Sequence, residues 1–125
     1  MIPDKRLGRI TMAALIIGLS ACDSNTTPSP AIQTYAANTI PASPALAAIY
    51  QRSCQACHAR GTSDAPLTGH GAAWQQRLDK GMDTLVNNVV AGIGGMPPYG
   101  LCMDCNTEEF RQLIRFMAIP ADAGE

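Results

Sequence analysis

The sequence lacks a long hydrophobic run. Its apolar stretch ITMAALIIGL, residues 10–19, is shorter than the roughly 20 apolar residues that cross a bilayer as a helix. The basic residues Lys5, Arg6 and Arg9 precede this stretch, and a polar segment follows it. A buried core helix is the alternative, but the basic flank and the polar continuation favour export. We therefore predict a secretory signal peptide over residues 1–21.

The sequence also lacks a strong excess of charge, because its formal net charge is only −1. Removal of residues 1–21 would take away three basic side chains and Asp4, which leaves 6 basic and 9 acidic residues and a net charge of −3. Binding to nucleic acid depends on basic residues that neutralise phosphates. We therefore expect no nucleic-acid partner.

The end of the predicted signal peptide, Leu19-Ser20-Ala21-Cys22, resembles the lipobox of bacterial lipoproteins. In such a motif the cysteine becomes the new N-terminus and is acylated. The resemblance implies that Cys22 carries lipid and holds the protein on the periplasmic side of a bacterial membrane. Asp23 resembles the retention signal of enteric-type lipoproteins and favours the inner membrane.

Residues 23–43 are rich in Ser, Thr, Asn, Pro and Ala and contain few large apolar side chains. Such a segment cannot bury enough surface to offset the entropy that is lost when it orders. We therefore expect a lipid anchor and flexible tether over residues 22–43. One folded domain is predicted over residues 44–119, with a tail over residues 120–125.

The stretch SCQACHAR places two thiols three positions apart, with a histidine directly after the second. Pro44 can begin a helix whose apolar stripe continues to Cys54, so Cys54 and Cys57 are expected one turn apart on the same face. Two thiols in this arrangement can add across the vinyl groups of a haem, while His58 binds the iron. The motif therefore predicts one covalently attached haem c.

Zinc binding and thiol redox chemistry are the alternatives for these cysteines. A zinc ribbon would need a second C-x-x-C about 15 to 20 residues further on, and Cys102 lies much further from Cys57 than that. A thioredoxin-type pair would need alternating strand and helix patterns, and no convincing strand pattern is present. The exported context and the histidine favour haem.

The sixth position of a histidine-ligated iron decides between electron transfer and gas binding. The segment IGGMPPYG, residues 93–100, holds Met96 between glycines and prolines, neither of which continues a helix. An ordered loop of this kind can bring the Met96 thioether to the iron. His70 is a weaker candidate, because it stands at the start of a predicted helix, where a polar residue usually has a capping role.

These features resemble the cytochrome c5 family of class I c-type cytochromes. The resemblance runs from residue 50 to residue 117 and includes CQACHARG, DAPLTGHGAAW, RLDKGMDTL and GGMPPYGLCMDC followed by NTEEF. Its most specific part is a methionine-proline loop followed closely by a second C-x-x-C. The sequence departs from the family at His70, where an aspartate is usual, and at Thr107, where an acidic residue is usual.

The resemblance implies four residues that hold the haem, two through thioether bonds and two as axial ligands: Cys54 and Cys57, then His58 and Met96. It also implies a short disulfide between Cys102 and Cys105, which an oxidising compartment would favour. A redox-active dithiol is the alternative for this pair. No cationic neighbour is visible in the sequence to lower a thiol pKa, and Asp104 would oppose such a shift.

Three further residues are candidates for supporting the haem. A ligating histidine usually donates its other ring N–H to a carbonyl, and by the resemblance this carbonyl belongs to Pro66. Trp74 and Arg77 lie on one predicted helix. Trp74 as a core residue and Arg77 as a solvated charge are as plausible as a role for both near the haem propionates.

Helices are expected over residues 70–80 and 83–91, and a last helix begins at a capping box formed by Asn106 and Glu109 and ends near residue 118. The predicted fold is all-α, a small class I cytochrome c fold of about four short helices around one haem. We expect a membrane-tethered periplasmic electron carrier with redox protein partners, not an enzyme with a small-molecule substrate. A haem c subunit of a larger membrane oxidase or dehydrogenase is the main alternative. A haem-based gas sensor is another.

Overall fold

The computed structural model describes residues 27–122 of the 125-residue chain. The predicted signal peptide, Cys22 and Asp23 lie outside the described residues, as do the last three residues of the chain. None of the helices in residues 27–122 is long and apolar enough to span a membrane.

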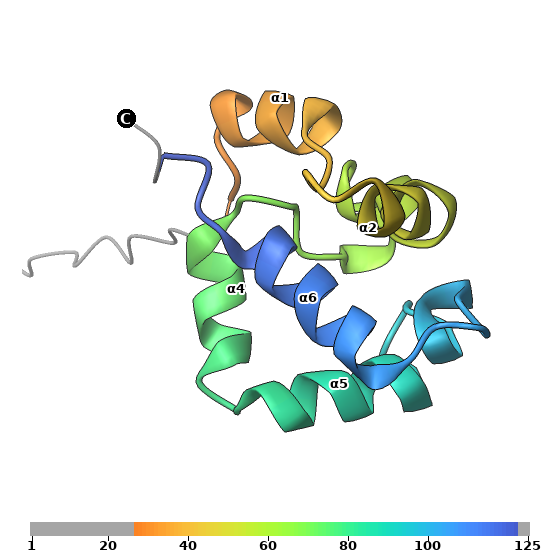
Figure 1. Ribbon diagram of the computed structural model, residues 1–125. Coiled ribbons are helices and arrows are strands. Elements are labelled where there is room, and N and C mark those ends of the chain that lie inside the picture. Colours follow the sequence, from red (N-terminus) through yellow and green to blue (C-terminus); the bar gives the residue numbers. More distant parts are fainter. Residues whose placement is uncertain (1–26, 123–125) are drawn as a thin grey trace, which may run out of the picture.

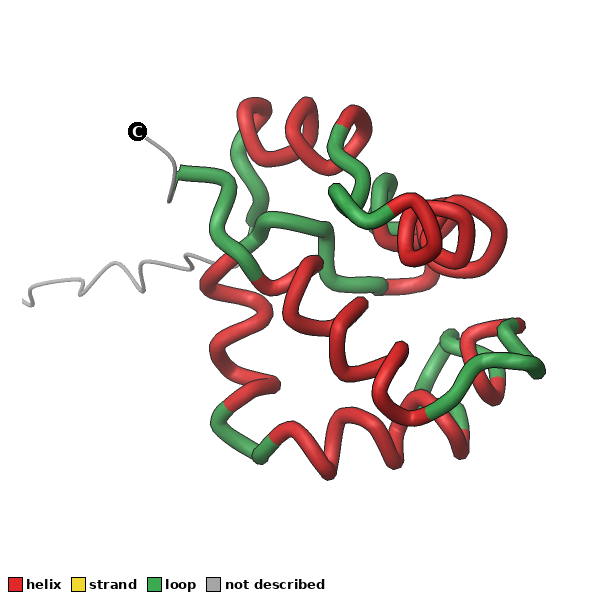
Figure 2. Tube along the Cα trace, viewed as in Figure 1, coloured by secondary structure: helices red, strands yellow, loops and turns green. Residues whose placement is uncertain are grey.

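Between residues 27 and 122 the chain consists of helices and connecting loops, without a strand (Figure 2). In chain order these are α1 (Pro30–Asn38), α2 (Pro44–Ile49), the π-helical turn η1 (Tyr50–Cys54), α3 (Gln55–His58), the short 3₁₀ turn η2 (Thr62–Asp64), α4 (Gly71–Leu78), α5 (Met82–Ala91), the 3₁₀ turn η3 (Pro98–Leu101) and α6 (Thr107–Ala118). The all-α prediction is confirmed.

Helix α6 runs through the middle of the molecule and contacts α2, α4 and α5 (Figure 1). Four apolar residues spaced along one face of this helix are all buried: Phe110, Leu113, Ile114 and Met117. The predicted capping box is present. The Asn106 side chain accepts from the N–H groups of Glu108 and Glu109, and the Glu109 carboxylate accepts from the Asn106 N–H.

The helix that leads to SCQACH is less regular than the sequence predicts. It begins at Pro44 as expected, but the Ser43 side chain makes no capping hydrogen bond. At η1 the N–H of Gln55 donates to the carbonyl of Tyr50, the i to i+5 bond of a π-helical turn. Such turns are rare and often occur at functional sites. Here the turn ends at Cys54.

The structure differs from the flexible tether predicted for residues 22–43, because residues 30–38 form α1. The Ser29 side chain accepts from the N–H of Ile32 and caps the helix, and Ala36 is fully buried. The Tyr35 ring lies so close to Gly69 that a Cβ at position 69 would come within 2.5 Å of it. A few close contacts therefore order a segment whose composition alone predicts disorder.

The C-terminal boundary also differs from the predicted one at residue 119. The Ala121 N–H donates to the Gly69 carbonyl at 3.0 Å, and Pro120 packs against Gly71. Helix α1 and residues 120–121 thus both contact the residues that lead into α4. The folded unit is longer at both ends than residues 44–119.

Candidate haem site

His58 is the last residue of α3 and only 6% of its surface is exposed. Its Nδ1 lies 2.9 Å from the Pro66 carbonyl oxygen, which can only accept, so Nδ1–H is the donor. Burial lowers the pKa of His58, which keeps the imidazole neutral. The Nε2 lone pair is therefore the one available to a metal ion, as in most histidine ligands.

The loop that carries Pro66 is fixed by backbone hydrogen bonds to two helices. The Thr68 N–H donates to the His58 carbonyl at 2.9 Å, and the Gly69 N–H donates to the Met117 carbonyl at 2.8 Å. The first bond joins the loop to the end of α3 and the second joins it to α6. The acceptor of the His58 ring is thus held by the same helix that carries the ring.

Two buried side chains fix the same loop. The indole N–H of Trp74 donates to the Leu67 carbonyl at 2.8 Å, and the hydroxyls of Tyr50 and Thr68 lie 2.9 Å apart. The Trp74 ring also stacks on the His58 ring, with 5.8 Å between centroids. The structure therefore places Trp74 in the core next to the imidazole. The contact between Tyr50 and Thr68 cannot be predicted from the sequence, because nothing in the local sequence indicates that the two hydroxyls meet.

Cys54 and Cys57 carry free thiols, and both side chains are half-buried. Cys54 ends η1, and Cys57 lies one turn later on α3. Burial raises the pKa of the Cys54 thiol to about 11, so this thiol is protonated at neutral pH. Two free thiols one turn apart, directly before a buried histidine in the chain, suit thioether bonds to a haem.

Met96 is half-buried in a tight turn closed by two hydrogen bonds between Ile93 and Met96, at 2.9 and 3.1 Å. Gly95 allows this turn to approach η2, since a Cβ at position 95 would lie 2.6 Å from the Ser63 Cβ. The Met96 methyl group lies against Gly100. A hollow of about 380 Å³ borders residues 91–98. The expected ordered loop is present around Met96.

Cys102 and Cys105 form a disulfide, with 5.4 Å between their Cα atoms. The sequence showed no cation near this pair, but the structure does: Nη2 of Arg52 lies 3.3 Å from Cys102 Sγ. Arg52 also binds Asp104 with both terminal nitrogens, each at 2.9 Å. The pKa of Asp104 is lowered by this guanidinium. Sequence separation concealed the contact, since Arg52 belongs to η1.

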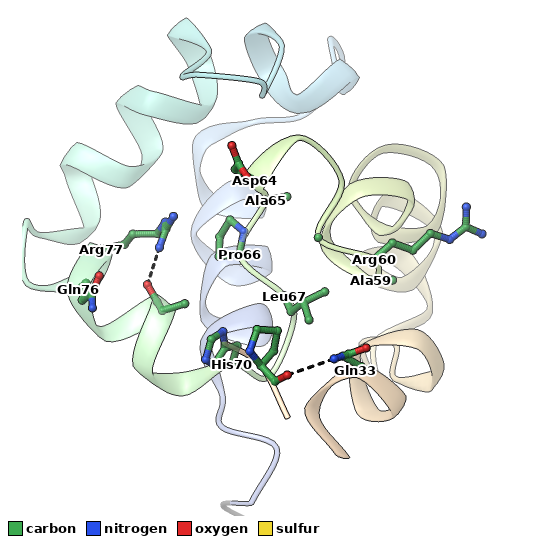
Figure 3. A pocket seen from close by; sticks show the side chains of 13 residues that line it. Gln33, Ala59, Arg60, Asp64, Ala65, Pro66, Leu67, His70, Gln76 and Arg77 are labelled. Atoms are coloured by element: carbon green, nitrogen blue, oxygen red, sulfur yellow. Dashed lines mark hydrogen bonds between the residues drawn. The ribbon is translucent and has the colours of Figure 1, made fainter. Parts of the chain in front are cut away.

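A second hollow, of about 720 Å³, lies between α4 and the loop after α3 (Figure 3). Pro66, His70 and Arg77 are among its lining residues, whereas none of the four expected haem-binding residues is. Arg77 donates to the Ala73 carbonyl of its own helix.

His70 is the N-cap residue of α4, but its side chain makes no capping hydrogen bond, so the expected capping role is wrong. The imidazole is buried instead.

The donor set fits a covalently bound haem. It combines a neutral, buried imidazole whose Nδ1 is already engaged, two free thiols one helical turn apart, and a thioether on a constrained loop. Zinc would prefer four nitrogen, thiolate or carboxylate ligands, and Cys102 and Cys105 are already bonded to each other.

Comparisons with known proteins agree with this chemistry. The family described as "Cytochrome C oxidase, cbb3-type, subunit III" matches residues 41–117. Cytochrome c5 of Ectopseudomonas mendocina is 40% identical over 72 residues, which cover 56% of this chain and 83% of the relative. Cytochrome c5 of Azotobacter vinelandii is 40% identical over 67 residues, which cover 52% of this chain and 81% of the relative.

Cytochrome c-555 of Prosthecochloris aestuarii is also similar, with 40% identity over 77 residues and 78% of the relative covered. Among solved structures, a chain in the "Crystal structure of electron transfer complex of nitrite reductase with cytochrome c" has 34% identity and a TM-score of 0.54. The likeness covers 61% of this chain and 93% of that one. The chain belongs to the cytochrome c5 family of class I c-type cytochromes, and it is an electron carrier that binds haem c covalently.

Proposed function

We propose that this cytochrome is a periplasmic one-electron carrier, tethered to a membrane through Cys22, in which Cys54 and Cys57 bind the haem and His58 and Met96 are its axial ligands. The hydrogen bond from His58 Nδ1 to the Pro66 carbonyl carries the proposal. It fixes the tautomer and leaves Nε2 for the iron.

The bound haem supplies a one-electron iron couple. His58 and Met96 would both hold the iron, which would leave no position for a substrate, so the chemistry that the haem would supply is electron exchange with a protein partner. The soft thioether of Met96 raises the reduction potential compared with a second histidine. The hydrogen bonds of residues 66–69 hold the His58 ring in one orientation, which limits reorganisation when the iron changes charge.

Covalent attachment is tested by acid-acetone extraction of the denatured holoprotein. Haem should stay with the wild-type chain, whereas replacement of both Cys54 and Cys57 by Ala should abolish attachment. Haem that leaves the wild-type chain on extraction would contradict the proposal.

Axial ligation is tested through the weak absorption band near the red end of the spectrum that reports an iron–sulfur bond. Met96→Ala and Met96→His should both remove this band, and Met96→His should lower the potential. His70→Ala is the matched control and should leave the band unchanged. A band that persists in both Met96 variants would assign the sixth position to another methionine.

Lipidation of Cys22 is tested by fractionation. The wild-type protein should sediment with membranes and be released by detergent but not by high salt, because the link is apolar and salt screens only charges. Cys22→Ser should give a soluble form or an uncleaved precursor with an unchanged haem spectrum. Asp23→Ser should move the protein to the outer membrane in an enteric-type host. A mature wild-type protein that is free in the periplasm would refute the tether.

A second candidate function is a haem c subunit of a larger membrane oxidase. It is favoured by the oxidase subunit description of the family that matches residues 41–117. The nitrite reductase complex favours the first candidate, a carrier that docks transiently on a redox enzyme. Stoichiometric co-purification with a membrane complex after mild detergent extraction would support the subunit. Recovery of the cytochrome alone would support the carrier.

A further inference from the structure

Residues 93–105 carry both Met96 and the disulfide, and few polar contacts hold them in place. The backbone hydrogen bonds of this segment are all internal: they join Ile93 to Met96, Pro97 to Gly100, Tyr99 to Cys102, and Cys102 to Cys105. In the part of the chain that the structure describes, every hydrogen bond or ion pair from this segment to the rest of the protein is made by Arg52. The polar attachment of the Met96 segment therefore depends on one side chain.

Arg52 makes this attachment from the haem-binding helix. It lies in η1, two residues before Cys54. Its two terminal nitrogens each bind one carboxylate oxygen of Asp104, which is the planar two-bond geometry that arginine favours. The same Nη2 contacts the sulfur of Cys102, which is 1% exposed. The guanidinium thus joins the thioether-forming end of the helix to the disulfide.

Both ends of the segment continue into helices: Ile93 follows α5 after one residue, and Cys105 directly precedes Asn106, the N-cap residue of α6. Near the α5 end, Gly95 packs closely on Ser63. Met96 lies between this end and the disulfide. Loss of the Arg52 contacts would leave residues 93–105 held by their two helix junctions and by apolar packing, without a polar contact to the haem-binding helix, so the Met96 side chain could move away from its position more easily.

We infer that Arg52 is a positioning residue for Met96: through Asp104 it fixes the disulfide end of residues 93–105 on the haem-binding helix and so favours the iron-bound position of the thioether. The inference rests on the proposed role of Met96 as axial ligand. Arg52 and Asp104 are 47% and 72% exposed. An exposed pair contributes up to about 1 kcal/mol, which corresponds to a shift of roughly 2- to 5-fold in the equilibrium between bound and released Met96.

The test is a titration of the oxidised holoprotein with imidazole, which competes with Met96 for the iron. Loss of the iron–sulfur absorption band measures the displacement. Arg52→Ala and Asp104→Asn should each raise the apparent affinity for imidazole by roughly 2- to 5-fold. Arg52→Lys keeps the charge but loses the planar guanidinium, so its affinity for imidazole should fall between those of Arg52→Ala and the wild type. High salt should reduce the difference in imidazole affinity between the wild type and the variants, because salt screens the ion pair.

The ion pair between Arg111 and Asp83 provides a matched control. It joins α6 to α5 at the surface and has no contact with residues 93–105. Arg111→Ala should leave the affinity for imidazole unchanged, which separates positioning from a general loss of stability. The double variant Arg52→Asp with Asp104→Arg exchanges the two charges and should bring the affinity for imidazole part of the way back to that of the wild type. Asp104→Asn keeps the test valid if Arg52→Ala fails to mature.

Four outcomes are decisive. Unchanged imidazole affinity in both Arg52→Ala and Asp104→Asn would overturn the inference, and so would an equal change in Arg111→Ala. Absence of the iron–sulfur band from the wild-type protein would instead overturn the proposed role of Met96. A rise in affinity confined to the Arg52 and Asp104 variants supports the inference.

Discussion

The hydroxyl groups of Tyr50 and Thr68 lie 2.9 Å apart, and neither residue is exposed to solvent. Tyr50 begins the π-helical turn before Cys54, and Thr68 follows the proline whose carbonyl accepts from His58. This one hydrogen bond therefore joins the helix that carries the predicted haem thiols to the loop that orients the predicted iron ligand.

Tyr50→Phe and Thr68→Val should each lower the free energy of unfolding by about 1–3 kcal/mol, because each leaves the other hydroxyl buried without a partner. The double variant should lose less free energy of unfolding than the sum of the two single losses, since it leaves no unpaired hydroxyl. Guanidinium unfolding of the holoprotein measures all three. Strict additivity would show that the hydroxyls do not interact.

Trp74→Phe should lower the free energy of unfolding by about 1–3 kcal/mol, because the Leu67 carbonyl loses its indole donor inside the core. The stack on His58 is kept in part by the phenyl ring. The exposed variant Gln75→Ala on the same helix is the control and should change stability by less than about 0.5 kcal/mol. Equal stability of Trp74→Phe and wild type would show that the carbonyl finds another donor.

Gly69→Ala tests the packing of α1. Position 69 has a φ of +85°, and a Cβ there would meet the Tyr35 ring, so we expect a loss of about 2–4 kcal/mol in the free energy of unfolding. Gly81→Ala is the matched control, because Gly81 has a φ of +88° with no atom within 4 Å of the added Cβ. It should cost only about 1–2 kcal/mol of backbone strain. Similar losses at both positions would mean that α1 does not pack on Gly69 in solution.

Asn106→Ala should lower the free energy of unfolding by about 1 kcal/mol, since it removes the acceptor for the N–H groups of Glu108 and Glu109. Glu109→Gln retains an acceptor for the Asn106 N–H and should cost less. Urea unfolding with haem absorption as the probe measures both changes. An Asn106→Ala variant as stable as the wild type would indicate that water replaces the cap.

Local rules in the sequence predict the parts of this fold that depend on neighbouring residues. The capping box at Asn106 and the stripe from Phe110 to Met117 define α6, and the glycines and prolines around Met96 define its loop. Contacts between distant residues follow no such rule. Arg52 could not be assigned to Asp104 from sequence, because the pairing depends on how η1 lies against η3.

Helix α1 was not predicted, because average composition measures how much apolar surface a segment offers and not how well one side chain fits. Ala36 is fully buried, and Tyr35 packs closely on residue 69 only because that residue is a glycine. A local pattern was nevertheless present: Ser29 and Pro30 are a good helix start, and Tyr35 lies one turn after Ile32. Given more weight than composition, it would have identified the helix.

If Cys22 carries a lipid, the position of α1 would also limit how far the electron carrier can travel. Ser29, the N-cap residue of α1, lies seven positions after Cys22, and a chain of this length spans at most about 25 Å. With a lipid on Cys22, the cytochrome would stay within this radius of its attachment point. Docking surfaces on partners in the same membrane would then lie within its range, whereas a partner in the opposite membrane would be out of reach.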